Sequence, residues 1–233
     1  MTFIDVKTTG WHMQQESAGR AVCLISGGID SPVAAWLTMR SGIRLDLVHF
    51  HSYPFSCTSA IQKAKELSGK LLPLQGGGKL HLVPFLDLQE AVFRNTPNSL
   101  RIVIYRRAMA RIAEKIANRL GASFLVTGDS LGQVSSQTLQ NLATVDQAVK
   151  MPILRPLIGF DKAEIISAAK GIDTYEISIR PHEDCCTLFS LGNPATRTTA
   201  ARVEIQEQKV EMRALIDRCV EAVETIPIGI REN

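Results

Sequence analysis

A six-residue turn, SGGIDS at residues 26–31, combines residue types that bind phosphate. Adjacent glycines leave no Cβ in the way and allow positive φ, so backbone N–H groups can converge on an anion. Ser31 is expected to cap the helix that follows, with Pro32 as its first helical residue. The turn therefore predicts an anion site at a helix N-terminus, with the carboxylate of Asp30 inside it.

The spacing of this turn excludes the Walker A loop, because Gly-x-x-x-x-Gly-Lys-Ser/Thr is absent and no lysine follows the glycines. An ordinary strand-to-helix turn with a capping serine has the same composition. The six residues alone leave both interpretations open.

The histidines and cysteines are further candidates for chemistry. His49 and His51 flank Phe50 at a predicted strand end, but no thiol or carboxylate spacing supports a zinc site, so no metal-ligand set is predicted. The five cysteines are odd in number and contain no C-x-x-C pair, which fits neither a disulfide framework nor a structural zinc site. At least one thiol is therefore a candidate for chemistry.

Strands alternate with helices around these groups. Buried strands are predicted at residues 21–25, 45–50, 80–85, 123–127 and 151–154, with helices starting at Pro32 and spanning 58–72, 100–120 and 199–225. This alternation predicts an α/β fold, a doubly wound and mostly parallel sheet with helices on both faces. Ligands of such sheets bind at the carboxyl ends of strands, where residues 26–31, 49–51 and 127–130 fall.

Length and composition describe an ordinary globular chain. Of its 233 residues 45% are hydrophobic and 21% charged, enough for one domain with a full core. No apolar stretch is long enough to span a membrane and the N-terminus lacks the pattern of a secretory signal, so a cytoplasmic protein is expected. The net charge of +3 neither requires nor excludes a nucleic-acid partner.

Four more stretches narrow the class: LDLVHFHSYPF from residue 45, VTGDSLGQVSSQTLQNL from 126, LRPLIGFDKAEII from 154 and YEISIRPHEDCCTLF from 175. SGGIDS resembles the signature of the PP-loop ATP-pyrophosphatases, and with these stretches the chain resembles the catalytic region of the tRNA 4-thiouridine synthetases, which also supply sulfur for thiamine thiazole. The resemblance spans residues 20–210 approximately. It implies an adenine nucleotide alpha hydrolase-like fold and ATP-dependent sulfur transfer to a tRNA uridine, through an adenylated uridine, with release of pyrophosphate and AMP.

The same resemblance implies the site residues. ATP would be held by Leu24, Ile25, Ser26, Gly27, Gly28, Asp30, Ser31, His49, Phe50, Arg106, Gly128 and Gln137. Asp30, accompanied by Mg²⁺, and Lys162 would serve adenylation, and Cys185 would pair with a persulfide-carrying thiol during sulfur transfer. A divalent cation between Asp30 and the phosphates would remove their repulsion.

Simpler interpretations exist for several of these residues. Lys162 follows a predicted N-cap, Asp161, and fits an exposed lysine in a first helical turn. Cys186 could be the functional thiol in place of its neighbour Cys185. The remaining cysteines are predicted to be structural or incidental, with the first in the core: Cys23, Cys57 and Cys219.

A basic stripe on the helix predicted at 100–120 is the candidate for RNA contact. Four cations recur every four residues on the face opposite Tyr105, Met109 and Ile112: Arg107, Arg111, Lys115 and Arg119. The first three are predicted RNA-binding residues, since such a stripe could follow a phosphate backbone. A solvated helix face has the same pattern.

The predicted organisation is an extension over residues 1–19, a PP-loop ATP-pyrophosphatase domain over 20–198 and a C-terminal helix over 199–233 packed on the same domain. Members of the family grip tRNA with a ferredoxin-like segment and a THUMP domain, which the residues before the first strand are too few to hold. Expected partners are tRNA, a persulfide carrier such as a cysteine desulfurase or rhodanese-type protein, and a separate tRNA-binding domain or subunit. A homodimer is compatible with the sequence, and no membrane partner is expected.

Two rival interpretations stay open from sequence. One is a PP-loop adenylating enzyme for another substrate class, such as an amidotransferase-type synthetase. The other is a non-catalytic module that binds ATP or AMP.

Overall fold

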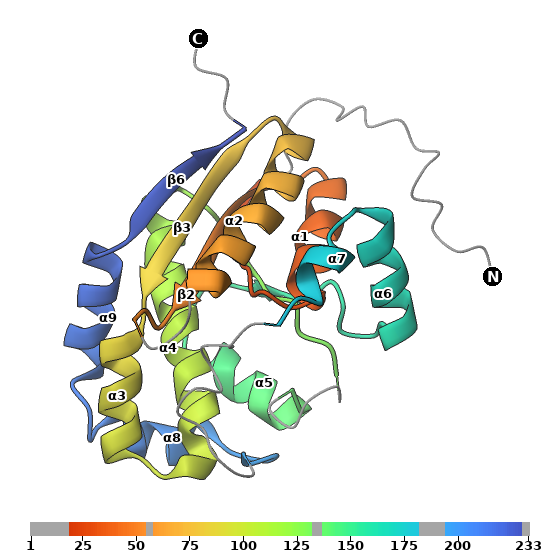
Figure 1. The fold of residues 1–233 in the computed structure, drawn as a ribbon. Coiled ribbons are helices and arrows are strands. Elements are labelled where there is room, and N and C mark those ends of the chain that lie inside the picture. Colours follow the sequence, from red (N-terminus) through yellow and green to blue (C-terminus); the bar gives the residue numbers. More distant parts are fainter. Residues whose placement is uncertain (1–18, 55–57, 132–136, 182–193, 230–233) are drawn as a thin grey trace.

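The computed structural model describes residues 19–54, 58–131, 137–181 and 194–229. In these ranges six strands form one sheet in the order β5-β4-β1-β2-β3-β6. Figure 1 labels β2, β3 and β6 of this sheet. The parallel strands are β1 (Arg20–Leu24), β2 (Arg44–His51), β3 (Gly78–Pro84), β4 (Phe124–Val126) and β5 (Ile153–Leu154). The edge strand β6 (Glu224–Ile228) pairs antiparallel with β3.

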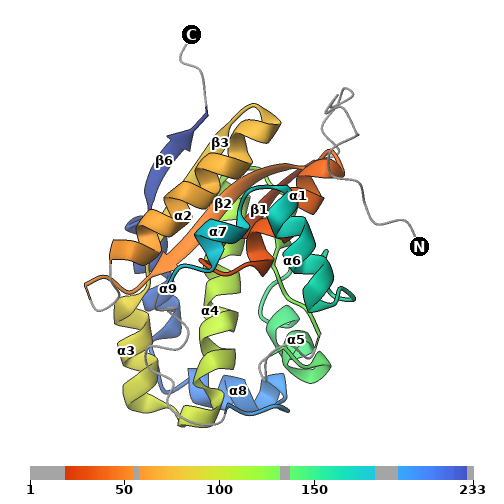
Figure 2. The ribbon, with the colours of Figure 1, turned by 45° about the vertical axis from the view of Figure 1, so that its right-hand side comes forward.

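Helices cover both faces of the sheet (Figures 1 and 2). One face packs on α1 (Asp30–Arg40), α2 (Thr58–Leu71), the short 3₁₀ helix η1 (Leu72–Gln75), α6 (Lys162–Gly171) and α7 (Tyr175–Ser178). The core on the other face includes residues of α3 (Leu86–Asn95), α4 (Asn98–Arg119), α5 (Leu139–Asp146), α8 (Ala200–Glu207) and α9 (Met212–Glu221). The predicted doubly wound α/β fold is confirmed.

The central strand shows how the sequence produces this burial. Along β1, Ala21 and Cys23 face one core cluster and Val22 faces the other, which is the two-residue period of a strand with both faces covered. The chain winds from β1 through β2 to β3, then crosses to β4 and β5 on the opposite side of β1. The carboxyl end of β1 therefore lies at the point where the winding direction reverses, which is where such sheets bind ligands.

The C-terminal part differs from the single helix predicted at 199–225. The structure has two helices, α8 and α9, followed by the strand β6. Val210 and Met212 between and at the start of these helices are both buried, and a spacing of two residues cannot place both on one helix face. Thr225 and Ile226 are β-branched and pair with β3, which favours a strand there.

The helices α3, α5 and α7 and the 3₁₀ helix η1 were not predicted. The strands β1 to β5 and the helices α2 and α4 match the predicted ranges to within a few residues, and α1 and α6 begin close to their predicted starts. Within the described ranges, no helix combines the length and the hydropathy needed to cross a bilayer.

Candidate functional site

The turn after β1 joins directly to α1, but its serine acts differently from the prediction. The helix begins at Asp30 with Ile29 as N-cap, and no side chain caps it. The Ser31 hydroxyl instead accepts a hydrogen bond from the backbone N of Ser26 (2.8 Å) and lies 3.1 Å from the Ser26 hydroxyl. Ser31 thus closes the turn on itself, and the first turn of α1 keeps no side-chain cap at the end that attracts anions.

The glycines of the turn do not use the left-handed region that was expected of them. Neither Gly27 nor Gly28 has a positive φ. A Cβ on Gly28 would lie 3.4 Å from the Ser26 hydroxyl oxygen, an ordinary contact. At Gly28 the turn therefore tolerates a small side chain sterically.

Gly128, by contrast, is required by the packing of the protein itself. A Cβ there would lie 2.6 Å from the backbone N and 2.7 Å from the Cα of Ser31. A side chain at position 128 would therefore require the backbone to shift. This close approach brings the segment after β4 against the first turn of α1 and unites two of the three predicted strand ends.

Asp30 and Lys162 meet although 132 residues separate them in sequence. The ammonium of Lys162 lies 2.8 Å from a carboxylate oxygen of Asp30. A capping box fixes the helix start beneath Lys162, since Asp161 accepts from the backbone N of Glu164 and Glu164 accepts from that of Asp161. The predicted N-cap is confirmed, and the two residues predicted to serve adenylation form one ion pair beside the turn.

A second charged cluster lies at the ends of β4 and β5. Arg106 of α4 donates to Asp129 at 2.5 Å, and Arg155 donates to the same carboxylate at 3.2 Å. Gln137 adds a longer hydrogen bond to it at 3.4 Å. Sequence reasoning named Arg106 and Gln137 but missed Asp129 and Arg155, which stand directly after predicted strands within the stretches VTGDS and LRPL and could have been found there.

The residues at the end of β2 are mostly buried. His49 bonds through Nδ1 to the carbonyl of Ile25 (3.0 Å) and so ties the ends of β1 and β2 together. The Phe50 ring packs edge-on against Phe85, with centroids 5.3 Å apart. Ile25 and Phe50 are both buried in the core clusters, and the backbone N of Ile25 donates to the carbonyl of Val48 (2.8 Å).

The short helix α7 is anchored to the turn from the other side. The buried Lys63 donates to the carbonyls of Ser178 (2.8 Å) and Arg180 (2.6 Å), and burial, helped by Arg180, lowers its pKa. The Ser178 hydroxyl donates to the carbonyl of Gly28 at 3.3 Å. Lys63 therefore supports the turn of residues 26–31 through α7.

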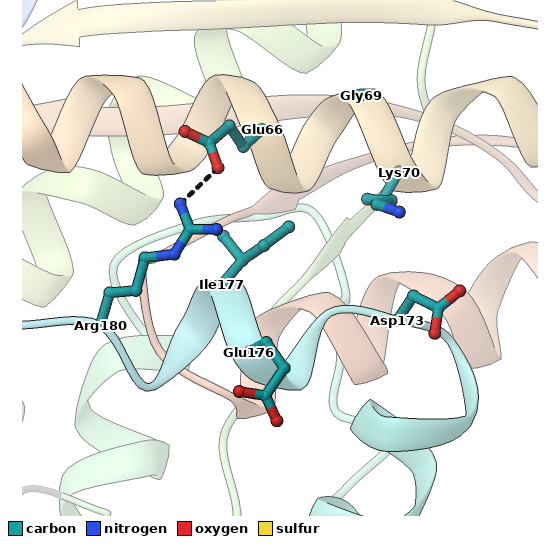
Figure 3. Close-up of a pocket in the computed structure, with 7 residues that line it drawn as sticks. All are labelled: Glu66, Gly69, Lys70, Asp173, Glu176, Ile177 and Arg180. Atoms are coloured by element: carbon teal, nitrogen blue, oxygen red, sulfur yellow. Dashed lines mark hydrogen bonds and ion pairs between the residues drawn. The ribbon is translucent and has the colours of Figure 1, made fainter.

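A groove of about 510 Å³ lies between α2 and α7 (Figure 3). Arg180 crosses it to pair with Glu66 at 2.6 Å. Its lining also includes Lys70, Asp173 and Glu176, with Ile177 between them. None of the predicted site residues within the described ranges lines this groove. It is separate from the strand-end cluster formed by Arg106, Asp129, Gln137 and Arg155.

The basic stripe on α4 pairs with acidic and carbonyl groups of α8 and α9. Arg107 is fully buried and pairs with Glu207 (2.8 Å) and Glu204 (3.0 Å) of α8. Arg111 also pairs with Glu207, at 2.8 Å. Lys115 pairs with Asp217 of α9 at 2.6 Å, and Arg119 donates to the carbonyl of Val220. The prediction of RNA contacts was wrong at Arg107, because this side chain is fully buried. Arg111 and Lys115 are partly exposed and already ion-paired, and RNA contact by these two residues stays a prediction. The stripe holds α8 and α9 onto α4.

The predicted functional thiol, Cys185, its neighbour Cys186, and Cys57 lie outside the described residues. The other two cysteines are buried, as predicted for structural residues. Burial raises the pKa of Cys23 to about 12 and that of Cys219 to about 11. Both therefore stay protonated and unreactive at neutral pH.

The donor set suits magnesium held jointly with a nucleotide. In the described part of the chain, no three His, Cys, Asp or Glu side chains gather to hold a metal ion. Asp30 is the acidic residue in the first turn of α1. Mg²⁺ is usually bound by one or two carboxylates together with substrate phosphates, so a single aspartate fits the ion with ATP present.

A family model described as "Thiamine biosynthesis protein (ThiI)" matches residues 16–212. The chain belongs to the ThiI family. A relative from Brevibacillus brevis, named "Probable tRNA sulfurtransferase", is 40% identical over 232 residues, which are 95% of this chain and 58% of that protein. The chain spans little more than half the length of the curated relatives it matches.

Solved structures agree with this membership. The crystal structure of a 4-thiouridine synthetase–RNA complex with bound ATP is 42% identical, with a TM-score of 0.87 over 90% of this chain and 55% of that one. An NMN synthetase from Francisella tularensis is 16% identical, with a TM-score of 0.55 over 88% of this chain and 84% of that one, a likeness that concerns the fold alone. The fold is thus the PP-loop, adenine nucleotide alpha hydrolase-like fold predicted for the ThiI-family chain.

Proposed function

We propose that this chain is the catalytic part of an ATP-dependent tRNA sulfurtransferase that forms 4-thiouridine. The observation that carries the proposal is the Asp30–Lys162 pair beside the uncapped start of α1, in a chain of the ThiI family. The names of its relatives support tRNA as the substrate, and the ATP bound to the 42% identical synthetase supports ATP.

The phosphates of ATP would lie at the turn of residues 26–31, where the N-terminus of α1 favours negative charge. Arg106, Gly128 and Gln137 would complete the site from the neighbouring strand ends. Lys162 is paired with Asp30 in an exposed position, so its ammonium can turn to the phosphates when a nucleotide arrives. Mg²⁺, held by Asp30 and the phosphates, would supply neutralisation of charge on the leaving pyrophosphate.

The reaction would proceed in two steps. The C4 oxygen of the uridine attacks the α-phosphorus of ATP and pyrophosphate leaves, while Lys162 offsets the charge that develops on the phosphates. A sulfur nucleophile then attacks C4 and displaces AMP. Cys185 is proposed to form or resolve a disulfide with a persulfide carrier in this second step, with Cys186 as the alternative thiol. The same sulfur chemistry is proposed to serve thiamine thiazole synthesis.

The deciding experiment incubates the chain with ATP, Mg²⁺, unmodified tRNA and sulfide, then measures 4-thiouridine by nucleoside analysis and pyrophosphate in parallel. Both products are expected. ATP binding without pyrophosphate release would indicate a non-catalytic module, whereas pyrophosphate release that depends on ammonia rather than sulfide would indicate another substrate class.

The role of Cys185 is tested separately with Cys185→Ser and Cys186→Ser under two sulfur sources. Cys185→Ser should lose thiolation from a protein persulfide carrier, keep pyrophosphate release, and recover part of its thiolation with free sulfide. Loss in Cys186→Ser alone would move the role to the neighbouring residue, and full activity in both would place the sulfur chemistry in the partner.

A further inference from the structure

The carboxylate of Asp129 is the point at which four elements of the strand-end cluster meet. Its Oδ1 accepts from Nη2 of Arg106 (2.5 Å) and from Nε2 of Gln137 (3.4 Å). Its Oδ2 accepts from the hydroxyl of Thr127 (2.8 Å) and from Nε of Arg155 (3.2 Å). These donors come from α4, from the start of the α5 region, from the end of β4 and from the segment after β5.

The carboxylate of Asp129 is not available to coordinate a metal ion. An ionised carboxylate offers about four lone-pair positions on its two oxygens, and each oxygen of Asp129 already accepts two hydrogen bonds. The side chain is also buried, with 7% of its surface exposed. Asp129 therefore cannot hold a metal ion or receive a substrate proton without giving up one of these donors.

We propose that Asp129 is the positioning residue of the nucleotide site, which holds Arg106 in the orientation that ATP requires and fixes Gln137 beside it. The inference rests on the proposed function, because that proposal places Arg106 and Gln137 at ATP. An arginine side chain has many rotamers, and a buried carboxylate at hydrogen-bond distance selects one of them before the ligand arrives.

The position of Asp129 is itself fixed relative to the phosphate turn. Its neighbour Gly128 packs directly against the backbone of Ser31, so the residue after it cannot move independently of the start of α1. Asp129 therefore transmits the position of the turn to the guanidinium of Arg106.

Electrostatic attraction and side-chain orientation predict opposite changes in ATP affinity when the charge of Asp129 is removed. Arg155 makes two further hydrogen bonds to Asp146, at 3.1 and 2.5 Å, so Asp129 shares one negative charge between Arg155 and Arg106. Neutralising Asp129 would leave more net positive charge beside a polyanion and would tighten ATP binding if attraction were all that mattered. If orientation matters more, ATP binding weakens, so the sign of the change separates the two roles.

The test measures the Kd of the intact chain for ATP by calorimetry, in the parent and in Asp129→Asn, Arg106→Gln and the double variant. Asp129→Asn is expected to raise the Kd by about tenfold or more, with a higher KM for ATP and a kcat for pyrophosphate release within about threefold of the parent. The double variant should bind no more weakly than Arg106→Gln alone, since Asp129 acts through Arg106. Asp146→Asn is the matched control, because it removes a carboxylate from the outer side of the same network, and it should change the Kd less than about twofold.

Thr127→Val provides a second measurement if Asp129→Asn does not fold. It removes only the hydroxyl that orients Oδ2 and should raise the Kd by a few-fold in the parent but not in the Arg106→Gln background. An unchanged or lower Kd in the folded variants, or effects that add to those of Arg106→Gln, would overturn the inference while leaving the proposed function intact. A parent chain that does not bind ATP would overturn the proposed function and, with it, this role of Asp129.

Discussion

Two ion pairs in this molecule have the same N···O distance but differ in burial. Lys162 lies 2.8 Å from Asp30 at the strand-end site, and Arg107 lies 2.8 Å from Glu207 between α4 and α8. The side chains of the first pair are 50% and 26% exposed, and those of the second are 0% and 7% exposed. Distance therefore does not tell a pair that must stay together from one whose members can separate, and burial does.

The physical reason is what happens when the partners separate. An exposed pair contributes roughly 0–1 kcal/mol, so Lys162 can leave Asp30 for a phosphate at little cost. A buried pair that loses one member leaves an unpaired charge out of water, which costs about 3–5 kcal/mol. The α4–α8 pair thus cannot exchange partners during a reaction.

The largest expected effect concerns the buried pair. Arg107→Met should lower the free energy of unfolding by about 3 kcal/mol or more, since Glu207 keeps only Arg111 as a cationic partner. Lys115→Met, whose pair with Asp217 is about half exposed, should cost less than about 1 kcal/mol. Urea unfolding of both variants measures this difference. Equal, small losses for the two variants would remove the distinction between buried and exposed pairs on α4.

The exposed pair should show the reverse behaviour. Asp30→Ala and Lys162→Ala are each expected to lower pyrophosphate release by about a hundredfold or more, because each acts on charge that develops during adenylation. Their free energies of unfolding should stay within about 1 kcal/mol of the parent. Arg94→Ala is the control, since it breaks a similar exposed pair with Glu90 outside the site and should change neither quantity. Pyrophosphate release within a few-fold of the parent would show that both residues are ordinary surface charges.

A smaller effect on stability and ATP binding is expected at Gly128, which packs against the start of α1. The Cβ of Gly128→Ala would overlap the backbone of Ser31, so the variant should lose about 1–3 kcal/mol of stability and bind ATP more weakly. Gly159→Ala is the matched control, because a Cβ there would meet nothing within 4 Å. Thermal unfolding with and without ATP measures both effects. A neutral Gly128→Ala would mean that the close approach can relax without disturbing the turn.

The smallest effect is a dependence of stability on pH at the α4–α8 interface. Burial raises the pKa of Glu207, but hydrogen bonds from Arg107 and Arg111 outweigh burial and leave the pKa below its usual 4.5. A group with a lowered pKa in the folded state stabilises above its unfolded pKa, and that stability is lost as pH falls through the folded pKa. Stability from this group should therefore be complete above pH 4.5 and decline below it. Glu207→Gln should remove this part of the decline in unfolding curves measured between pH 3 and 7, and an unchanged decline would assign it to other carboxylates.

The sequence allowed the fold, and the two residues of the Asp30–Lys162 pair, to be predicted because both depend on local patterns. Apolar runs located the strands, and the motifs around Asp30 and Lys162 identified both residues before the structure joined them. The role of Arg107 could not be predicted in this way. A helix pattern shows that a face is charged but not what covers it, and the acids that cover this one lie about a hundred residues later on α8.

Contacts between residues far apart in sequence also explain where the structure departs from the other sequence-based predictions. Gly128 was assigned to the nucleotide, whereas its contact with Ser31 depends on how two strand ends pack, which no local pattern records. The hydroxyl of Ser31 had two ways to satisfy a backbone donor, and it bonds back to Ser26 rather than capping its own helix. Asp129 was missed because its importance comes from converging donors on separate elements.

The antiparallel edge strand has a practical consequence for handling the protein. Because β6 runs antiparallel to β3, Ile228 lies opposite Gly78 at the amino end of β3. The strand β1 begins with Arg20 at the same end of the parallel strands (Figure 2). The described backbone thus starts and stops on the side away from the strand ends that carry Asp30, Gly128 and Lys162. A fluorophore or an affinity handle attached near either point would lie away from the turn of residues 26–31.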